Sequence, residues 1–300
     1  RSSRTPSSRS ARSSTRVRHA VRWIAIAGGA FLLWLVAVWP PPLWYRTHWP
    51  SKTAFMTMRG DAVSDGGGAA GQRGRGFPAE PTYRPVPIDS ITDWLPRAAM
   101  IGEDNRFLEH GGIDYLAILE ALGYRRAEFV WGNPRDQAEL RYTLGTLWTR
   151  RAKLRGASTI TQQLAKNLYL SPSRNPLRKV KEGVTAYRLE AALSKRRLME
   201  LYLNVAEFGP NIWGAEAASQ FYFNRPASRM TPIQAASLAG SLPFPLSSNP
   251  AYRTGRMRWR RDLILRRMRG EVVEVPREEV DERIPPPPPV VEEIVVPDSI

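Results

Sequence analysis

The chain has 300 residues, 42% of them hydrophobic, which is enough for one well-packed domain with additional segments. Its 44 Lys and Arg against 28 Asp and Glu give a net charge of +16, which favours anionic partners such as nucleic acid, lipid headgroups or phosphorylated substrates. It contains no cysteine and only three histidines, which excludes disulfides and thiolate metal sites and disfavours a zinc enzyme.

The N-terminal region has the pattern of a membrane anchor. Residues 1–22 are rich in Arg and Ser and carry no acid, which predicts a disordered basic tail on the cytoplasmic side. The apolar segment 23–43 is long enough to cross a hydrocarbon core of roughly 30 Å. A signal peptide cleaved after residues 36–38 is the alternative, but the long apolar region and bulky Trp39 disfavour it.

Composition divides the remaining chain into three parts. Residues 44–86, Gly-rich between 60 and 76, are expected to form a periplasmic linker. Residues 87–270 are helical in pattern and are expected to form the domain. Residues 271–300 are acidic and Pro-rich, which predicts a disordered tail that builds no core.

Several helices of this domain have recognisable signals. Thr231–Gln234 is a capping box with proline at the first helical position, so a helix should begin there. Apolar residues at helical spacing predict three further buried faces. They are Ile160, Leu164 and Leu168; then Leu177, Val180, Val184, Tyr187 and Ala191; then Leu198, Leu201, Tyr202 and Val205.

Three segments could carry chemistry. Residues 101–114 concentrate acids at a helix-to-loop junction, where a partly desolvated carboxylate such as Glu103 can act as a general base or merely end a helix. Residues 156–167 offer hydroxyl and amide donors and one lysine to a sugar or phosphate, although Ser158 could simply cap a helix. Residues 174–182 surround Glu182 with basic side chains, which suits a diphosphate or a solvated helix face.

The order and spacing of these motifs resemble the peptidoglycan glycosyltransferase family. The matching motifs are EDNRFxxHxGID, GASTITQQLAKN, RKVKE, SKRRLMELYLNVAEFG and AASQFYF. The likeness extends over roughly residues 88–270 and is greatest to the monofunctional biosynthetic transglycosylases, because no penicillin-binding S-x-x-K motif follows.

The resemblance implies a mainly α-helical, lysozyme-like, two-lobed domain behind a single transmembrane helix, in the bacterial inner membrane. The implied substrates are lipid II and the nascent glycan strand, with membrane lipids and cell-wall synthesis proteins as further partners and no nucleic acid. Glu103 would deprotonate the acceptor 4-hydroxyl, which attacks the anomeric carbon of the lipid-linked chain with inversion and expels undecaprenyl diphosphate. Glu182 would orient the basic residues, position the donor or hold a divalent ion such as Mg²⁺ or Mn²⁺.

The resemblance also assigns substrate-binding positions, with Glu103 and Glu182 as the catalytic pair. Those near the base are Asp104, Phe107 and His110; those of the second segment are Ser158, Thr161, Gln162, Gln163, Lys166 and Asn167; those of the phosphate side are Arg174, Arg178 and Lys181. The long, basic and aromatic link 122–155 departs from the family pattern and is expected to contact headgroups or to be an ordinary insertion.

Two other functions remain open from the sequence. A lysozyme-type hydrolase would use the same fold, but it usually needs two carboxylates beside the bond. A membrane-tethered binding protein would use the basic surface without catalysis, and the predicted location disfavours nucleic acid as its ligand.

Overall fold

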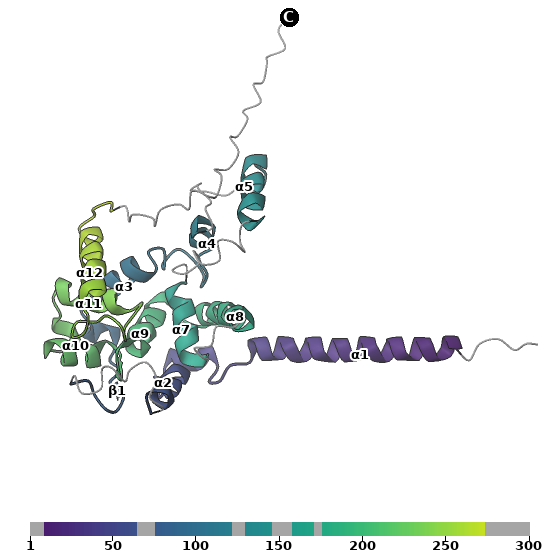
Figure 1. Cartoon of the computed structure of the whole chain (residues 1–300), viewed down its shortest axis with the longest axis horizontal. Helices are drawn as coiled ribbons and strands as arrows, with labels where there is room; N and C mark the ends of the chain where they lie inside the picture. The colour runs from purple at the N-terminus through teal and green to yellow at the C-terminus, as the bar shows by residue number, and fades with distance from the viewer. Residues whose placement is uncertain (1–8, 65–75, 122–129, 146–157, 171–175, 274–300) are drawn as a thin grey trace, which may run out of the picture.

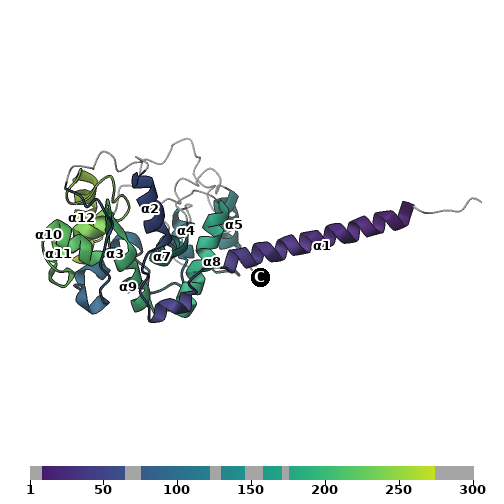
Figure 2. The same ribbon diagram turned by 90° about the horizontal axis from the view of Figure 1, so that it is seen from below.

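The computed structural model describes residues 9–64, 76–121, 130–145, 158–170 and 176–273. A long helix, α1 (Arg9–Val36), projects from a compact helical body, as Figures 1 and 2 show. Its segment Arg18–Val36 has a mean hydropathy of 1.6 and none of its residues is buried, so it is long and apolar enough to cross a membrane. The expected N-terminal apolar helix is therefore confirmed.

The helix begins earlier than we expected. Residues 9–22, predicted to be disordered, continue the same helix, and it ends at Val36 rather than at residue 43. Extending a formed helix costs little because nucleation has already occurred, and Arg is a good helix former.

The body is mainly helical, as predicted. Between α1 and the first active-site helix lie η1 (Pro42–Arg46), α2 (Ala54–Ser64), β1 (Thr82–Tyr83) and η3 (Ile88–Ser90). The next helices are α3 (Trp94–Glu103), α4 (Tyr115–Ala121), α5 (Pro134–Gly145), α7 (Ile160–Tyr169), α8 (Pro176–Ala192) and α9 (Lys195–Val205). The chain continues with β2 (Glu207–Gly209), β3 (Ile212–Trp213), α10 (Ala215–Phe223), η5 (Ala227–Arg229), α11 (Pro232–Ser241) and α12 (Gly255–Met268).

The core lies around α7, which packs against α2, α8 and α9. Its predicted apolar row is buried, as is the predicted face of α9, so both assignments are confirmed. A second cluster joins α3, α11 and α12 through small residues, including Ala98, Ala236 and Ala239. At Gly240 an added Cβ would lie 2.9 Å from the Met257 carbonyl oxygen, so this glycine lets α11 approach α12 closely.

The predicted start of α11 is confirmed in detail. Thr231 accepts a hydrogen bond from the backbone of Gln234, whose side chain accepts one from the backbone of Thr231. Pro232 is the first helical residue, where its missing N–H costs no hydrogen bond.

The predicted start of the domain at residue 87 is wrong. Tyr45, Phe55 and Met56 lie in the segment we expected to be a linker, yet they are buried in the main core. The ring of Phe55 meets that of Trp213 edge-on, with 6.0 Å between centroids. The short strand β1 also pairs in parallel with β3, which pairs antiparallel with β2. Short apolar segments without a helical period gave no signal in the sequence.

The predicted buried face of α8 is also wrong. Leu177, Val180 and Tyr187 are 51%, 52% and 41% exposed, whereas Ala186 and Leu189 are fully buried. The helix packs through small residues, and an added Cβ at Gly183 would lie 3.3 Å from a methyl group of Ile113. These small residues allow close packing, and Leu177, Val180 and Tyr187 lie on the outer face. Of the 122–155 link, residues 130–145 are described and include α5; of the tail, residues 271–273 are described.

Candidate active site

Glu103 is the last residue of α3. The helix ends because Asp104 leaves the helical conformation, with φ −161° and ψ 79°, while its N–H still bonds the Met100 carbonyl at 2.8 Å. Leu95, Ala98 and Ala99 are buried and hold the end of the helix in the body of the protein. The Glu103 side chain is only 9% exposed.

Two side chains hold the Glu103 carboxylate. Gln163 donates from Nε2 to Oε2 at 3.0 Å, and Arg260 donates from Nη2 to Oε1 at 2.8 Å. The buried hydroxyl of Tyr202 donates to Oε1 of Gln163 at 3.1 Å, which fixes the amide orientation. The same nitrogen of Arg260 also donates to the Gly102 carbonyl at 2.7 Å. Helices α7, α9 and α12 therefore position one carboxylate at the end of α3.

Burial raises the pKa of Glu103 above its ordinary value. The positive charges of Arg260 and Lys166 and the hydrogen bond from Gln163 lower the pKa, but they do not outweigh the loss of solvation. A carboxylate whose pKa is moved towards neutrality is a better general base than an ordinary surface glutamate.

Asp104 connects the base to the start of α7. Its carboxylate accepts a hydrogen bond from the backbone N–H of Ile160 at 2.9 Å and contacts Nε2 of His110 at 2.9 Å. The N-cap of α7 is Thr159, which forms a capping box with Gln162. Ser158, the cap considered from the sequence, instead accepts a hydrogen bond from Lys179 at 2.8 Å.

Three of the predicted binding residues have partners inside the protein. Phe107 is 1% exposed and lies beneath the Lys195 ammonium, 4.4 Å from the ring centroid. Thr161 is fully buried and donates to Glu190 at 2.6 Å. Gln162, predicted to bind substrate, is used in the cap of α7 and lines neither of the two cavities described below.

Glu182 lies buried at the centre of a cationic cluster. One of its oxygens accepts a hydrogen bond from Arg178 at 2.9 Å, and the other accepts one from Lys179. Burial lowers the pKa of Lys166 below its ordinary value, and the carboxylates of Glu182 and Glu103 oppose this shift. Lys166 therefore lies within the electrostatic reach of both predicted catalytic acids.

The predicted cations do not all gather around Glu182. Lys181 faces α1, where its Nζ lies 4.6 Å from the centroid of the Trp34 ring. Arg174 lies outside the described residues.

Two cavities adjoin this network. One of about 280 Å³ is lined by Glu103, Asp104, Asn105, Ser158, Arg267 and neighbouring residues. The other, of about 140 Å³, is lined by Gln163, Lys166, Asn167, Glu207, Arg59 and Phe55 among others. Gln163, which bonds Glu103, forms part of the second wall, so the carboxylate and its amide partner link the two spaces. The arrangement can bind a polar substrate on both sides of one buried base.

Three side chains of the kinds that bind metal ions already have hydrogen-bond partners within the protein. Asp104, His110 and Asp114 could direct one ligand atom each to a common point. However, Arg106 binds both oxygens of Asp114, at 2.9 and 3.2 Å, and Asp104 is bonded to His110 and Ile160. The guanidinium supplies the positive charge that a metal would bring, so these residues fit a structural network better than a metal site.

Sequence reasoning missed three residues of the site. Arg260, Tyr202 and Glu207 contact or adjoin the predicted residues from α12, α9 and β2. Tyr202 was assigned to the core, and Glu207 belongs to the NVAEFG part of a quoted motif without a role. Nothing in the local pattern around Arg260 indicated that it reaches residue 103.

Glu207 should give the fold a measurable pH dependence. Burial raises the pKa of Glu207 to about 7, although Arg59 at 3.2 Å opposes the shift. Between its ordinary pKa of 4.5 and about 7, the folded protein keeps this proton while the unfolded chain loses it. The free energy of unfolding therefore falls as pH rises through this range, by up to about 1.4 kcal/mol per pH unit.

Thermal unfolding of the wild type and of Glu207→Gln between pH 4.5 and 8 measures this effect. The variant lacks the carboxyl, so its stability relative to the wild type should increase with pH. A difference in stability between the two proteins that stays constant with pH would contradict the raised pKa of Glu207. Glu109→Gln is the matched control, because Glu109 is exposed.

Comparisons with known proteins show the family of this chain. A sequence model of the Transglycosylase family matches residues 137–269. The chain is 39% identical to the biosynthetic peptidoglycan transglycosylase of Bordetella pertussis over 262 residues, which is 87% of this chain and 94% of that protein. It is 37% identical to the Azoarcus protein of the same name, and the match covers 79% of this chain and 96% of that protein. It is 36% identical to the Neisseria gonorrhoeae protein of the same name, and that match covers 87% of this chain and 98% of that protein. The chain belongs to the biosynthetic peptidoglycan transglycosylase family.

Proposed function

We propose that this protein polymerises the glycan strands of peptidoglycan. It transfers the growing, lipid-linked chain to the 4-hydroxyl of lipid II and releases undecaprenyl diphosphate. The observation that carries the proposal is Glu103, a 9% exposed carboxylate that lines a cavity and is held by donors from two other helices. Family membership supports the same reaction.

The proton and charge movements follow from this arrangement. Glu103 accepts the proton of the acceptor 4-hydroxyl while the oxygen forms a bond to the anomeric carbon of the donor. The bond from that carbon to the lipid diphosphate breaks, and the configuration inverts. Because Arg260 and Gln163 already hold both carboxylate oxygens, the base stays oriented as it takes the proton.

The diphosphate needs positive charge more than it needs a proton. Lys166 lines the second cavity, Arg178 and Lys179 lie within its electrostatic reach, and Glu182 holds Arg178 and Lys179 in place. These cations can stabilise the charge that develops on the leaving group. Arg174 and Asn167 are proposed to complete this side and Ser158 to contact the substrate from the first cavity, with Lys181 and His110 in supporting positions.

The N-terminal helix supports a reaction at a membrane. We propose that α1 crosses the inner membrane once, with the basic N-terminal residues in the cytoplasm and the catalytic body in the periplasm. The lipid-linked substrates then diffuse in the same bilayer that holds the enzyme.

The experiment is a polymerisation assay with the full chain in detergent or nanodiscs and labelled lipid II. Formation of long glycan is expected. Shortening of finished glycan without polymer formation would instead show a hydrolase, which Glu182 disfavours because both its oxygens are bonded to cations.

The same assay, repeated in the presence of a chelator, tests whether polymerisation depends on a metal ion. Arg178 and Lys179 occupy the Glu182 oxygens that a divalent ion would need, so activity should persist in excess EDTA. A loss that added Mg²⁺ or Mn²⁺ restores would contradict this role of Glu182.

A further inference from the structure

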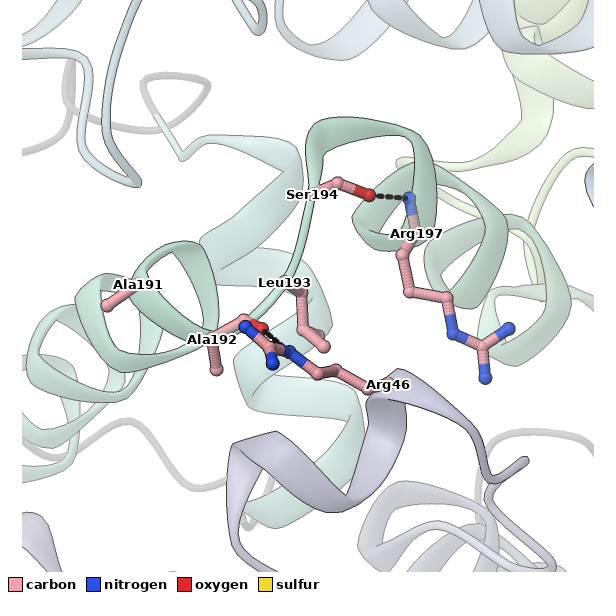
Figure 3. Close-up of a pocket in the computed structure, with 6 residues that line it drawn as sticks. All are labelled: Arg46, Ala191, Ala192, Leu193, Ser194 and Arg197. Carbon is pink, nitrogen blue, oxygen red and sulfur yellow. Dashed lines mark hydrogen bonds between the residues drawn. The ribbon is translucent and has the colours of Figure 1, made fainter.

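A second cavity of interest lies away from Glu103, beside the end of the membrane helix. It has a volume of about 380 Å³ and is lined by Arg46, Ala191, Ala192, Leu193, Ser194 and Arg197 (Figure 3). Arg46 ends η1, the next element after α1, and α8 packs against both α1 and η1. If α1 crosses the bilayer, this cavity lies at the level of the outer headgroups.

The two arginines of the cavity have different roles. Arg197 is used within the protein: it donates to the carbonyls of Tyr45 and His48 and pairs with Glu200 at 2.6 Å. Arg46 is exposed and makes one bond, from Nε to the Ala192 carbonyl at 2.8 Å. Its two terminal nitrogens have no further partner among the described residues, so they remain able to bind an anion.

The surroundings of Arg46 suit a phosphate group. Figure 3 shows the guanidinium at the Ala192 carbonyl and the Ser194 hydroxyl on the opposite side, accepting a hydrogen bond from the Arg197 backbone. The Ser194 hydroxyl can still donate its own proton. No carboxylate lines the cavity in the part of the chain that the structure describes. A guanidinium and a hydroxyl with no competing acid form a donor set for a phosphodiester.

Neighbouring side chains indicate that the phosphate belongs to a lipid. Leu43 and Trp44, next to Arg46, are 58% and 48% exposed. On α8, Lys181 faces Trp34 and Arg188 bonds the Val36 carbonyl, so cations surround the outer end of α1. Exposed apolar and aromatic side chains beside cations are typical of contact with the interface of a bilayer.

We propose that the cavity at Arg46 and Ser194 binds the headgroup phosphate of an anionic phospholipid. Leu43 and Trp44 lie against its glycerol and upper acyl region. Such a lipid fixes the junction between α1 and the body, and thus the height of the catalytic site above the bilayer. The inference rests on the proposed membrane anchoring and not on the transferase chemistry.

Titration of the full chain in detergent micelles with phosphatidylglycerol or phosphatidylcholine, followed by native mass spectrometry, tests the site. We expect phosphatidylglycerol to bind about fivefold more tightly than phosphatidylcholine, the effect of one basic side chain at an anionic surface. Arg46→Gln should lose this preference, and Arg46→Lys should retain most of it. Arg229→Gln, an exposed arginine on η5 far from α1, is the matched control.

Several outcomes would overturn the proposal. One is equal affinity of the wild type for the two lipids, and another is an unchanged preference for phosphatidylglycerol in Arg46→Gln. A third is displacement of the lipid by millimolar inorganic phosphate, which would identify a site for a soluble anion. Arg46-dependent binding of lipid II without binding of phosphatidylglycerol would also overturn it. A chain that binds phosphatidylglycerol through Arg46 but makes no glycan would refute the proposed function alone.

Discussion

Glu103→Gln is expected to reduce glycan polymerisation at least about 100-fold, the lower end of what a general base contributes. The amide cannot accept the proton of the acceptor hydroxyl, but it has nearly the same size. It can still accept a hydrogen bond from Gln163 or Arg260, so the surrounding helices should remain in place. The measurement is the initial rate of glycan formation from labelled lipid II at saturating and limiting substrate.

Glu109→Gln is the matched control, because Glu109 is an exposed acid in the same motif. It should polymerise like the wild type, and both variants should show the thermal stability of a folded protein. If Glu103→Gln retained more than a tenth of the wild-type rate, Glu103 would not be the base.

Arg260→Gln is expected to move the acid limb of the pH–rate profile to higher pH. Arg260 lowers the pKa of Glu103, both through its charge and through its hydrogen bond. Without Arg260 the burial of Glu103 is opposed only by weaker effects, so its pKa should rise further above the ordinary value. A larger fraction of the base is then protonated and inactive at neutral pH. Each unit by which the pKa exceeds the assay pH costs about tenfold in rate.

The pH dependence of kcat/KM between pH 5 and 9 measures this shift. Activity of Arg260→Gln should recover as pH increases, whereas Glu103→Gln should stay inactive throughout. Arg260→Lys should lie between the wild type and Arg260→Gln, and Arg258→Gln, an exposed neighbour on α12, should match the wild type. A uniform loss at every pH would show that Arg260 acts through structure or substrate contact and does not tune the pKa of Glu103.

The start of a helix and its buried face could be predicted from the sequence where they depend on residues close together in the chain, and so could the order of the motifs. The capping box at Thr231 and the apolar row of α7 depend on residues three and four apart, which the sequence displays directly. At the start of α7 the capping box of Thr159 and Gln162 has the same local spacing, whereas the bond from the Ile160 N–H to Asp104 joins segments far apart in the chain and could not be predicted.

The sequence by itself determined that this chain is mainly helical, carries an N-terminal apolar helix and has the motifs of a peptidoglycan transglycosylase with Glu103 as candidate base. The division into two lysozyme-like lobes stays a prediction. Only the tertiary structure showed that Arg260 and Tyr202 support that base and that α2 belongs to the body. It also placed Leu177, Val180 and Tyr187 of α8 on the outer face. These features depend on contacts between residues far apart in the chain, and the burial that moves a pKa exists only once those contacts form.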